Sequence, residues 1–482
     1  MLWIVLAFAT AVTISLFPTE IALLIISACV ILIVAFISPV AAVSTMLVLA
    51  PLRVLIATEA DFQLPLDIGQ LCLSLVILTI TINRTYRVFQ LKTWLYYIRY
   101  LFMIFLFLAI VIINGFVARS AAVWINEFLK WIQIALLLIM TILLSKHAHW
   151  IWLVGAVIVA GTSNALIGVY QFLGGSGAIH LLINDRYFRA FGTFGQPNPF
   201  GGFLGIITPI AIAISAALFV RLYRHRSTIL ERIVTFVCVL CSIIMLCGII
   251  TSWSRGAWIG LVIALAIMAS AIPRNLWKGF WFGSAALLLF ISLWISNTLP
   301  TSITNRLQSS VDEFISVRDV RGVDIDPSNY AVIERLAHWQ SALNMALSSP
   351  WLGLGFGNYE IVYDDFRLLN WREPLGHAHN YYLNLLGELG LLGLLVYGKV
   401  WLILFTMAWQ ARTHPNPISR AVAIGLLGSW TYFSVHSLFD NIYVNNLFLH
   451  LGTLIGILVV IYDQTLDKVE VSSCSTIHQI TQ

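Results

Sequence analysis

The sequence predicts an all-α, polytopic membrane protein with about twelve to fourteen transmembrane helices and one large, mainly helical loop outside the membrane. Of its 482 residues, 60% are hydrophobic and only 10% are charged, and the mean hydropathy is +0.90. Soluble globular domains are far more polar. Apolar runs of roughly 17 to 25 residues recur along nearly the whole chain, which is the length that a helix needs to cross about 30 Å of hydrocarbon.

Fourteen apolar segments are candidate spans. The first two are separated only by a tight turn at Pro18 and Glu20, so they form either two spans or a re-entrant hairpin. A cleaved signal peptide is not expected, because the first residues lack a basic region and no small-residue cleavage site precedes Phe17. The segments are 2–17, 20–38, 40–57, 66–83, 98–116, 121–144, 149–173, 199–221, 233–252, 255–272, 279–297, 381–408, 420–439 and 444–462.

These segments divide the chain into five parts. The parts are N-terminal transmembrane helices (1–173), further transmembrane helices with an outer loop at 174–198 (174–297), a large outer loop (298–380), C-terminal transmembrane helices (381–462) and a cytoplasmic tail (463–482).

Lysines and arginines set the expected orientation. With the N-terminus inside, the cytoplasmic segments carry 14 of them and the short outer loops carry 5. Cytoplasmic loops of membrane proteins are enriched in these residues. The large loop 298–380 is therefore expected on the outer side of the membrane. The cytoplasmic residues are Arg84, Arg87, Lys92, Arg99, Lys146, Arg221, Arg224, Arg226, Arg232, Arg274, Lys278, Arg412, Arg420 and Lys468, and the outer ones are Arg53, Arg119, Arg186, Arg189 and Arg255.

Within the large loop, residues 329–348 are expected to form an amphipathic helix. Its apolar stripe contains Leu336, Trp339, Leu343 and Leu347. The glycine-rich segment 353–357 follows, but it lacks the strand and the βαβ unit of a nucleotide site, so a tight turn or a lipid-headgroup contact is favoured.

Four arginines are candidate ligands for a phosphate group on the outer side. They are Arg255, Arg335, Arg189 and Arg306. Guanidinium groups bind phosphate oxygens bidentately and keep their charge at physiological pH, which favours a diphosphate or an acidic sugar. The alternative is that they pair with the many acidic residues of the large loop.

Three histidines, His338, His377 and His379, cluster near the end of the large loop. We favour His379 as a general base, because it opens a membrane helix where apolar surface meets water. His377 is interpreted as a loop residue. A metal site is not expected, since an i, i+2 pair such as His377 and His379 diverges on a helix by roughly 200 degrees.

Further pairs of residues support this region. His436 and Asp440 lie one helical turn apart, a spacing that permits a hydrogen bond and suits either function or a structural clamp. Gly390 and Gly393 would let another helix or a lipid tail approach closely. Glu127 and Lys130 are expected to form an ion pair within a span, with transport coupling as the alternative.

Together these motifs resemble the O-antigen ligase and Wzy polymerase superfamily of bacterial polysaccharide enzymes. Its signature is a histidine followed by Asn, Ser or Gln, nine residues and then Gly-x-x-Gly, which His379, Asn380, Gly390 and Gly393 match. Supporting blocks of sequence cover about 185 to 440. They are Arg189 through Gly-Thr-Phe-Gly-Gln-Pro-Asn198, Ser-Arg-Gly-Ala-Trp around Arg255, Arg335-x-x-x-Trp339, Gly-x-Gly-x-Gly-Asn-Tyr359, and His436 with Phe439-Asp440.

The resemblance implies a GT-C-like fold and an inverting, metal-independent glycosyl transfer on the outer leaflet, without a cofactor. The donor would be a glycan on undecaprenyl diphosphate, and the acceptor a hydroxyl of lipid A core, of a growing glycan or of a protein. His379 would accept the acceptor's proton, while Arg255 and Arg335 hold the diphosphate.

Other functions stay open on the sequence. Within the superfamily, ligase, polymerase and protein O-oligosaccharyltransferase share the same motifs. A bicarbonate-type transporter is a further alternative, but it would place its ionisable residues near the bilayer midplane rather than at one face. A structural scaffold would leave the outer arginines unexplained. Membrane lipids are expected partners, and nucleic acid is not.

Overall fold

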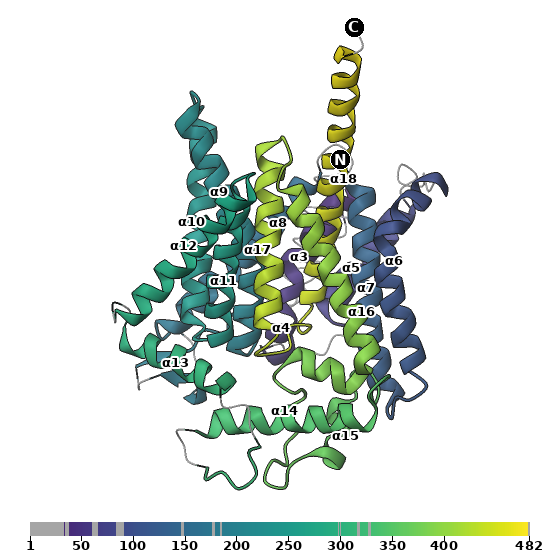
Figure 1. Cartoon of the computed structure of the whole chain (residues 1–482), viewed down its shortest axis with the longest axis vertical. Coiled ribbons are helices and arrows are strands. Elements are labelled where there is room, and N and C mark those ends of the chain that lie inside the picture. The colour runs from purple at the N-terminus through teal and green to yellow at the C-terminus, as the bar shows by residue number, and fades with distance from the viewer. Residues whose placement is uncertain are drawn as a thin grey trace, which may run out of the picture.

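The computed structural model describes residues 33, 38–59, 66–82, 91–145, 149–175, 179–183, 186–296, 298, 300–315, 319–325 and 329–480. Long helices form a bundle, and the shorter helices α13, α14 and α15 lie together across one end of it (Figure 1). The helices of the bundle are α3 (Pro39–Leu49), the 3-10 helix η1 (Ala50–Leu52), α4 (Arg53–Glu59), α5 (Ile68–Ile82), α6 (Leu91–Asn114), α7 (Ala121–Leu144), α8 (Trp150–Phe172), α9 (Pro197–Arg224), α10 (Ile229–Thr251), α11 (Arg255–Ala271), α12 (Leu276–Ile295), α16 (Tyr381–Ala411), α17 (Pro417–His436) and α18 (Leu447–Ile480).

Twelve of the predicted spans coincide with helices of this bundle, which confirms an all-α polytopic membrane protein. Eight of the described helices are long and apolar enough to cross a membrane, and three shorter apolar helices lie at Ile68–Thr81, Ile104–Asn114 and Arg255–Ala271. α17 belongs to neither group, and it is almost wholly buried among its neighbours. The predicted span 2–17 and nearly all of 20–38 lie outside the described residues.

Small residues bring α9, α11 and α17 into close contact. A side chain at Gly205 on α9 would overlap the ring of Tyr432 on α17. The Tyr432 hydroxyl donates a hydrogen bond to the carbonyl of Gly201 at 2.7 Å, and the Ser429 hydroxyl donates one to the carbonyl of Ile206 at 2.6 Å. Such close approach is typical of packed membrane helices. The N-terminal ends of α9 and α11 therefore meet the C-terminal end of α17 at one end of the bundle.

Two connections cover this end of the bundle. Residues 174–198 contain a 3-10 helix η4 (Ile179–Leu181) and a two-stranded antiparallel hairpin, β1 (Leu182–Ile183) with β2 (Tyr187–Phe188). The larger connection contains α13 (Thr301–Ile315), which the sequence analysis did not predict, then α14 (Tyr330–Ser348) and α15 (Tyr359–Phe366).

The predicted helix of the large loop is present as α14, but its buried face differs from the predicted stripe. Leu336 and Trp339 are buried, whereas Leu343 and Leu347 are 39% and 78% exposed. α14 packs on α15 and α16, and this contact buries Ala342 and Met345 instead. The sequence analysis chose the leucines because they recur at helical spacing. The helix instead packs Ala342 and Met345 against its neighbours.

The turn predicted at 353–357 is confirmed. Gly353, Gly355 and Gly357 all have positive φ, a conformation that suits glycine. The amides of Leu354 and Gly355 each donate a 3.0 Å hydrogen bond to a carbonyl of α16. The predicted ion pair inside α7 is also present, between Glu127 and Lys130.

Gly390 breaks α16 rather than admitting a helix or a lipid tail, so that prediction was wrong. Its backbone has φ +65° and ψ −168°, outside the helical region. The backbone of Trp351 lies against it, and the amide of Leu391 donates a 2.8 Å hydrogen bond to the carbonyl of Pro350. A side chain at Gly393 would meet Leu389 of its own helix. The signature glycines therefore shape the junction between the large loop and the membrane helix.

We expect Gly390→Ala to destabilise the folded protein by about 3 kcal/mol or more, because the new methyl group adds positive-φ strain to a collision with backbone atoms. Thermal unfolding in detergent measures the effect. Gly398→Ala on the same helix is the matched control, since its methyl group would enter open space and alanine favours the helix. Equal stability of the two variants would contradict this account of Gly390.

Candidate active site

Four arginines from different elements line one small cavity at the end of the bundle that these connections cover. Arg189 follows the β1–β2 hairpin, Arg255 begins α11, Arg306 lies on α13 and Arg335 lies on α14. All four line a cavity of about 30 Å³, together with Asn198, Ser254, Gly256 and Phe439. The structure thus brings together the four arginines that the sequence analysis selected. This volume is close to that of one water molecule, so a phosphate group would have to displace side chains on entering.

Hydrogen bonds to neighbouring loops hold two of these arginines. Arg189 donates to the carbonyl of Ser252 at 3.3 Å and to the side-chain oxygen of Asn198 at 3.4 Å. Arg306 donates to the carbonyl of Trp253 at 3.4 Å. Arg255 is only 7% exposed, although it is the first residue of its helix. The guanidinium groups are therefore positioned before any ligand arrives.

The cavity has a strongly positive electrostatic potential. The pKa of Arg189 is lowered to about 10, first by burial and then by the charges of Arg335 and Arg255, while Asp440 opposes them. The N-termini of α9 and α11 also reach the cavity, through Asn198 and through Ser254, Arg255 and Gly256. Helix N-termini attract anions because their amide groups are unsatisfied and the helix dipole is positive there. The arrangement suits an anion with more than one negative charge.

A second cluster joins His377, His379 and Asp440. The Nε2 atom of His377 lies 3.2 Å from Oδ1 of Asp440, and the amide of His379 donates a 3.0 Å hydrogen bond to Nδ1 of His377. Because Nδ1 accepts this hydrogen bond, His377 carries a proton on Nε2, the atom that faces the carboxylate. His377 therefore links Asp440 to the backbone of His379. It was interpreted as a loop residue, and the structure gives it this connecting position.

His379 is held in an unusual conformation and kept neutral. Its φ is +52°, which is uncommon for a residue with a side chain. Burial lowers its pKa to about 3, with the charges of His377, Arg335 and His338 acting in the same direction and Asp440 opposing them. Its Nδ1 atom lies 3.9 Å from Asp440, beyond hydrogen-bonding distance, and has no hydrogen-bond partner among the described residues. A neutral imidazole can accept a proton.

The expected divergence of His377 and His379 was wrong, because both residues precede α16 and neither is helical. Their ring centroids are 4.5 Å apart. His377, His379 and Asp440 each offer one ligand atom, and these atoms lie within 4.8 Å of one another, so the cluster could hold a metal ion. Two imidazoles and one carboxylate form a familiar ligand set. The neighbouring arginines oppose a divalent cation there, because like charges repel.

The hydrogen bond that the spacing of His436 and Asp440 permits is not formed. His436 instead lies 3.1 Å from the hydroxyl of Tyr432, through its Nδ1 atom. α17 ends at His436, so the helical spacing that would align the two side chains no longer applies. The carboxylate of Asp440 lies next to His377. Burial raises the pKa of Asp440, but the three nearby histidines and Arg335 lower it by more, so the net shift is downward. Asp440 is therefore ionised.

The remaining signature residues shape the site. Asn380 caps α16, because its side-chain oxygen accepts hydrogen bonds from the amides of Tyr382 and Leu383. Trp339 and Asn380 also line an apolar groove of about 480 Å³ beside the histidine cluster. The other residues of this groove are Leu336, Gln340, Leu343, Tyr382, Leu383 and Leu438.

His338 packs beneath the cluster rather than joining it. Its Nδ1 atom lies 2.9 Å from the hydroxyl of Tyr359, and its ring stacks on Tyr363. Burial lowers its pKa to about 4, aided by His377. Sequence reasoning did not select Asn198, His377 or Phe439 as site residues. Asn198 and Phe439 stood in motifs next to selected residues, which was the available signal.

Comparison with known proteins agrees with this region. A family model described as O-antigen ligase matches residues 240–398. The matched segment contains Arg255, Arg306, Arg335 and His379, whereas Arg189 and Asp440 lie outside it. No curated protein matches the chain.

Proposed function

We propose that the protein transfers a glycan from undecaprenyl diphosphate to an acceptor hydroxyl. The match of residues 240–398 to the O-antigen ligase family model supports this proposal. The family acts in surface polysaccharide biosynthesis, as a ligase or a polymerase. The bias of lysines and arginines supports a bacterial inner membrane with the site on the periplasmic side.

The observation that carries this proposal is the meeting of four arginines in one cavity next to a neutral histidine. A diphosphate ester bears two negative charges, and a cluster of arginines with two helix N-termini would bind it at the anchored end of the donor. The charge of Arg335 influences both His379 and Arg189, so the two clusters belong to one electrostatic unit.

The transfer needs no cofactor, because the substrates and His379 account for every bond, electron pair and proton that changes. The acceptor oxygen attacks the anomeric carbon from the side opposite the diphosphate, and the bond from that carbon to the phosphate oxygen breaks. His379 accepts the proton of the hydroxyl, and the electron pair of the broken bond remains on the diphosphate. The arginines stabilise this leaving group as its charge grows. Attack from the opposite face inverts the configuration at the anomeric carbon.

Donor binding would also prepare His379 as a base. A pKa of about 3 makes the imidazole a weak base in the free protein, since proton transfer is most efficient when the pKa of the base lies near the working pH. A diphosphate next to Arg335 would offset the charge of Arg335, which lowers this pKa in addition to burial and His377. The pKa of His379 would then be higher in the donor complex than in the free protein.

The apolar groove beside the histidines supports a lipid-linked substrate. It lies next to Asn380 and is lined by Trp339 and several leucines. Its volume of about 480 Å³ suits a stretch of prenyl or acyl chain rather than a sugar. A substrate whose polar part sits at the arginines and histidines would thus have apolar surface available for its lipid part.

Reconstitution of the purified protein with an undecaprenyl-diphosphate glycan and separate acceptors tests the function. We expect transfer to lipid A core for a ligase, elongation of a second lipid-linked glycan for a polymerase, and modification of a protein for an O-oligosaccharyltransferase. Product mass identifies the acceptor, and nuclear magnetic resonance of the new linkage reports inversion. No transfer to any of the three acceptors, from a donor that is shown to bind, would contradict the proposal.

Metal independence is tested on the same reaction. We propose that Asp440 and His377 orient His379 and that the cluster does not need a metal ion. Exhaustive chelation is therefore expected to leave the initial rate unchanged. Loss of activity that added zinc restores would instead assign His377, His379 and Asp440 as metal ligands.

A further inference from the structure

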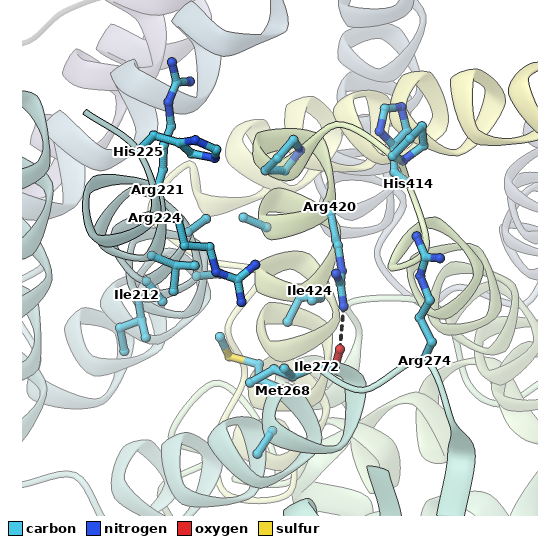
Figure 2. A pocket seen from close by; sticks show the side chains of 18 of the residues that line it. Ile212, Arg221, Arg224, His225, Met268, Ile272, Arg274, His414, Arg420 and Ile424 are labelled. Carbon is cyan, nitrogen blue, oxygen red and sulfur yellow. Dashed lines mark hydrogen bonds between the residues drawn. The ribbon is translucent and has the colours of Figure 1, made fainter. Parts of the chain in front are cut away.

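A second cavity opens at the end of the bundle opposite the candidate active site. It holds about 890 Å³ and lies among the C-terminal ends of α9 and α11, the loop before α10 and the N-terminal end of α17. The charge bias places this end on the cytoplasmic side. Figure 2 shows charged and imidazole side chains from these elements around the opening.

The rim of this cavity is strongly basic. Five arginines line it against one acidic residue, Glu231, and two histidines join them. The arginines are Arg221, Arg224, Arg226, Arg274 and Arg420, and the histidines are His225 and His414. Positive residues are common on the cytoplasmic side of membrane proteins, but there they usually face open water rather than a cavity.

Two of these arginines have protein partners. Arg221 pairs with Glu231 at 2.7 Å, and Arg420 donates a hydrogen bond from Nη2 to the carbonyl of Ile272 (Figure 2). The Nε atom of Arg420 is nevertheless buried without an acceptor among the described residues. Arg224 and Arg274 have no side-chain hydrogen bond or ion pair within the described part of the chain, and Figure 2 shows both side chains beside the opening. Donors are therefore available for an anion.

The inner wall of the cavity is apolar. It is made by the small side chains of Ala213 and Ala217 on α9, by Leu265 and Met268 on α11 and by Ile424 on α17. The helix surface next to the rim is also apolar, since Ile229 and Leu230 at the start of α10 are 75% and 70% exposed. An apolar wall below a basic rim fits an amphiphile, with its charge at the rim and its chains below.

We propose that this cavity binds an anionic phospholipid of the cytoplasmic leaflet, with its phosphate among Arg224, Arg274 and Arg420 and its acyl chains against α9 and α11. A free phosphate or a nucleotide would satisfy the rim but leave the apolar wall exposed to water. A zwitterionic lipid would bring its own cation into a rim that already carries excess positive charge. The proposal does not depend on the reaction at the outer face.

The test compares lipid binding to the full-length protein in detergent by native mass spectrometry. Wild type is expected to bind cardiolipin more tightly than phosphatidylcholine, and the double variant Arg224→Gln/Arg274→Gln to lose about tenfold or more in cardiolipin affinity. Arg232→Gln/Lys278→Gln is the matched control, because it removes the same charge from the same face outside the cavity. It is expected to keep the wild-type affinity.

If the arginine variant does not fold, the unfolding temperature of the wild-type protein tests the proposal independently. Cardiolipin is expected to raise the unfolding temperature, whereas inorganic phosphate and glycerol phosphate at the same concentration are not. Equal loss of cardiolipin affinity in both double variants would show a nonspecific charge effect and overturn the proposal. Equal stabilisation by phosphatidylcholine or by the soluble phosphates would overturn it as well.

Discussion

Replacing His379 by alanine is expected to reduce glycan transfer about 10²- to 10⁴-fold, to the background rate, while the protein still inserts and folds. His379 is the neutral imidazole of the site, and its removal would leave the acceptor hydroxyl without a base. Initial rates with a lipid-diphosphate donor measure the loss. His149→Ala, at the start of α8 and outside both cavities, is the control and should retain the wild-type rate. Full activity of a well-folded His379→Ala protein would contradict the assignment of His379 as the general base.

The pH dependence separates a base from a structural residue. A base acts only when deprotonated, so its contribution falls as the pH drops through its pKa. With the pKa of free His379 lowered to about 3, kcat/KM should hold on acidification to about pH 5. By contrast, kcat reports the donor complex, in which the diphosphate raises this pKa, so kcat should decline at a higher pH than kcat/KM. Identical profiles for the two parameters would contradict activation of His379 by the donor.

The sequence was sufficient to predict the helices of the bundle, because each span must satisfy its own backbone hydrogen bonds in lipid. The sequence analysis missed α13, which is too polar for a hydropathy signal, although its apolar residues Ile303, Leu307, Val311 and Phe314 recur at helical spacing. It also misjudged Gly390. A glycine in a helical pattern usually indicates close packing, and only the approach of the Trp351 backbone reveals that positive φ is required there.

Within the site, charge was easier to predict than contact. Arg189, Arg255, Arg306 and Arg335 lie in four separate segments, yet topology placed all of them at one membrane face, and the structure brings them to one cavity. The partners of Asp440 were missed. The sequence places it one turn beyond His436, but α17 ends there and the carboxylate instead meets His377, which is 63 residues earlier in the chain. Such a contact depends on tertiary structure and not on spacing.

The second large effect is expected from Arg255. Arg255→Lys keeps the positive charge but removes the planar, bidentate donor, and we expect kcat/KM to fall about 10²-fold, through a lower kcat and a higher KM. A higher KM reflects weaker binding of the donor diphosphate, and a lower kcat reflects weaker stabilisation of its charge as it leaves. Arg372→Lys, an exposed arginine of the large loop, is the control and should retain the wild-type rate. A folded Arg255→Lys protein with the wild-type rate would remove Arg255 from the proposed diphosphate site.

A double-mutant cycle then asks whether Arg255 and Arg335 bind the same group. Arg255 begins α11 and Arg335 lies within α14, and the whole of α12 and α13 separates these helices in the sequence. Both residues nevertheless line one cavity of about 30 Å³. If both guanidinium groups contact one diphosphate, removing the first misplaces the ligand for the second, and the double variant should be less impaired than the product of the two single losses. Strictly multiplicative losses would mean that the two arginines act on separate groups, and the cavity would then not be a single diphosphate site.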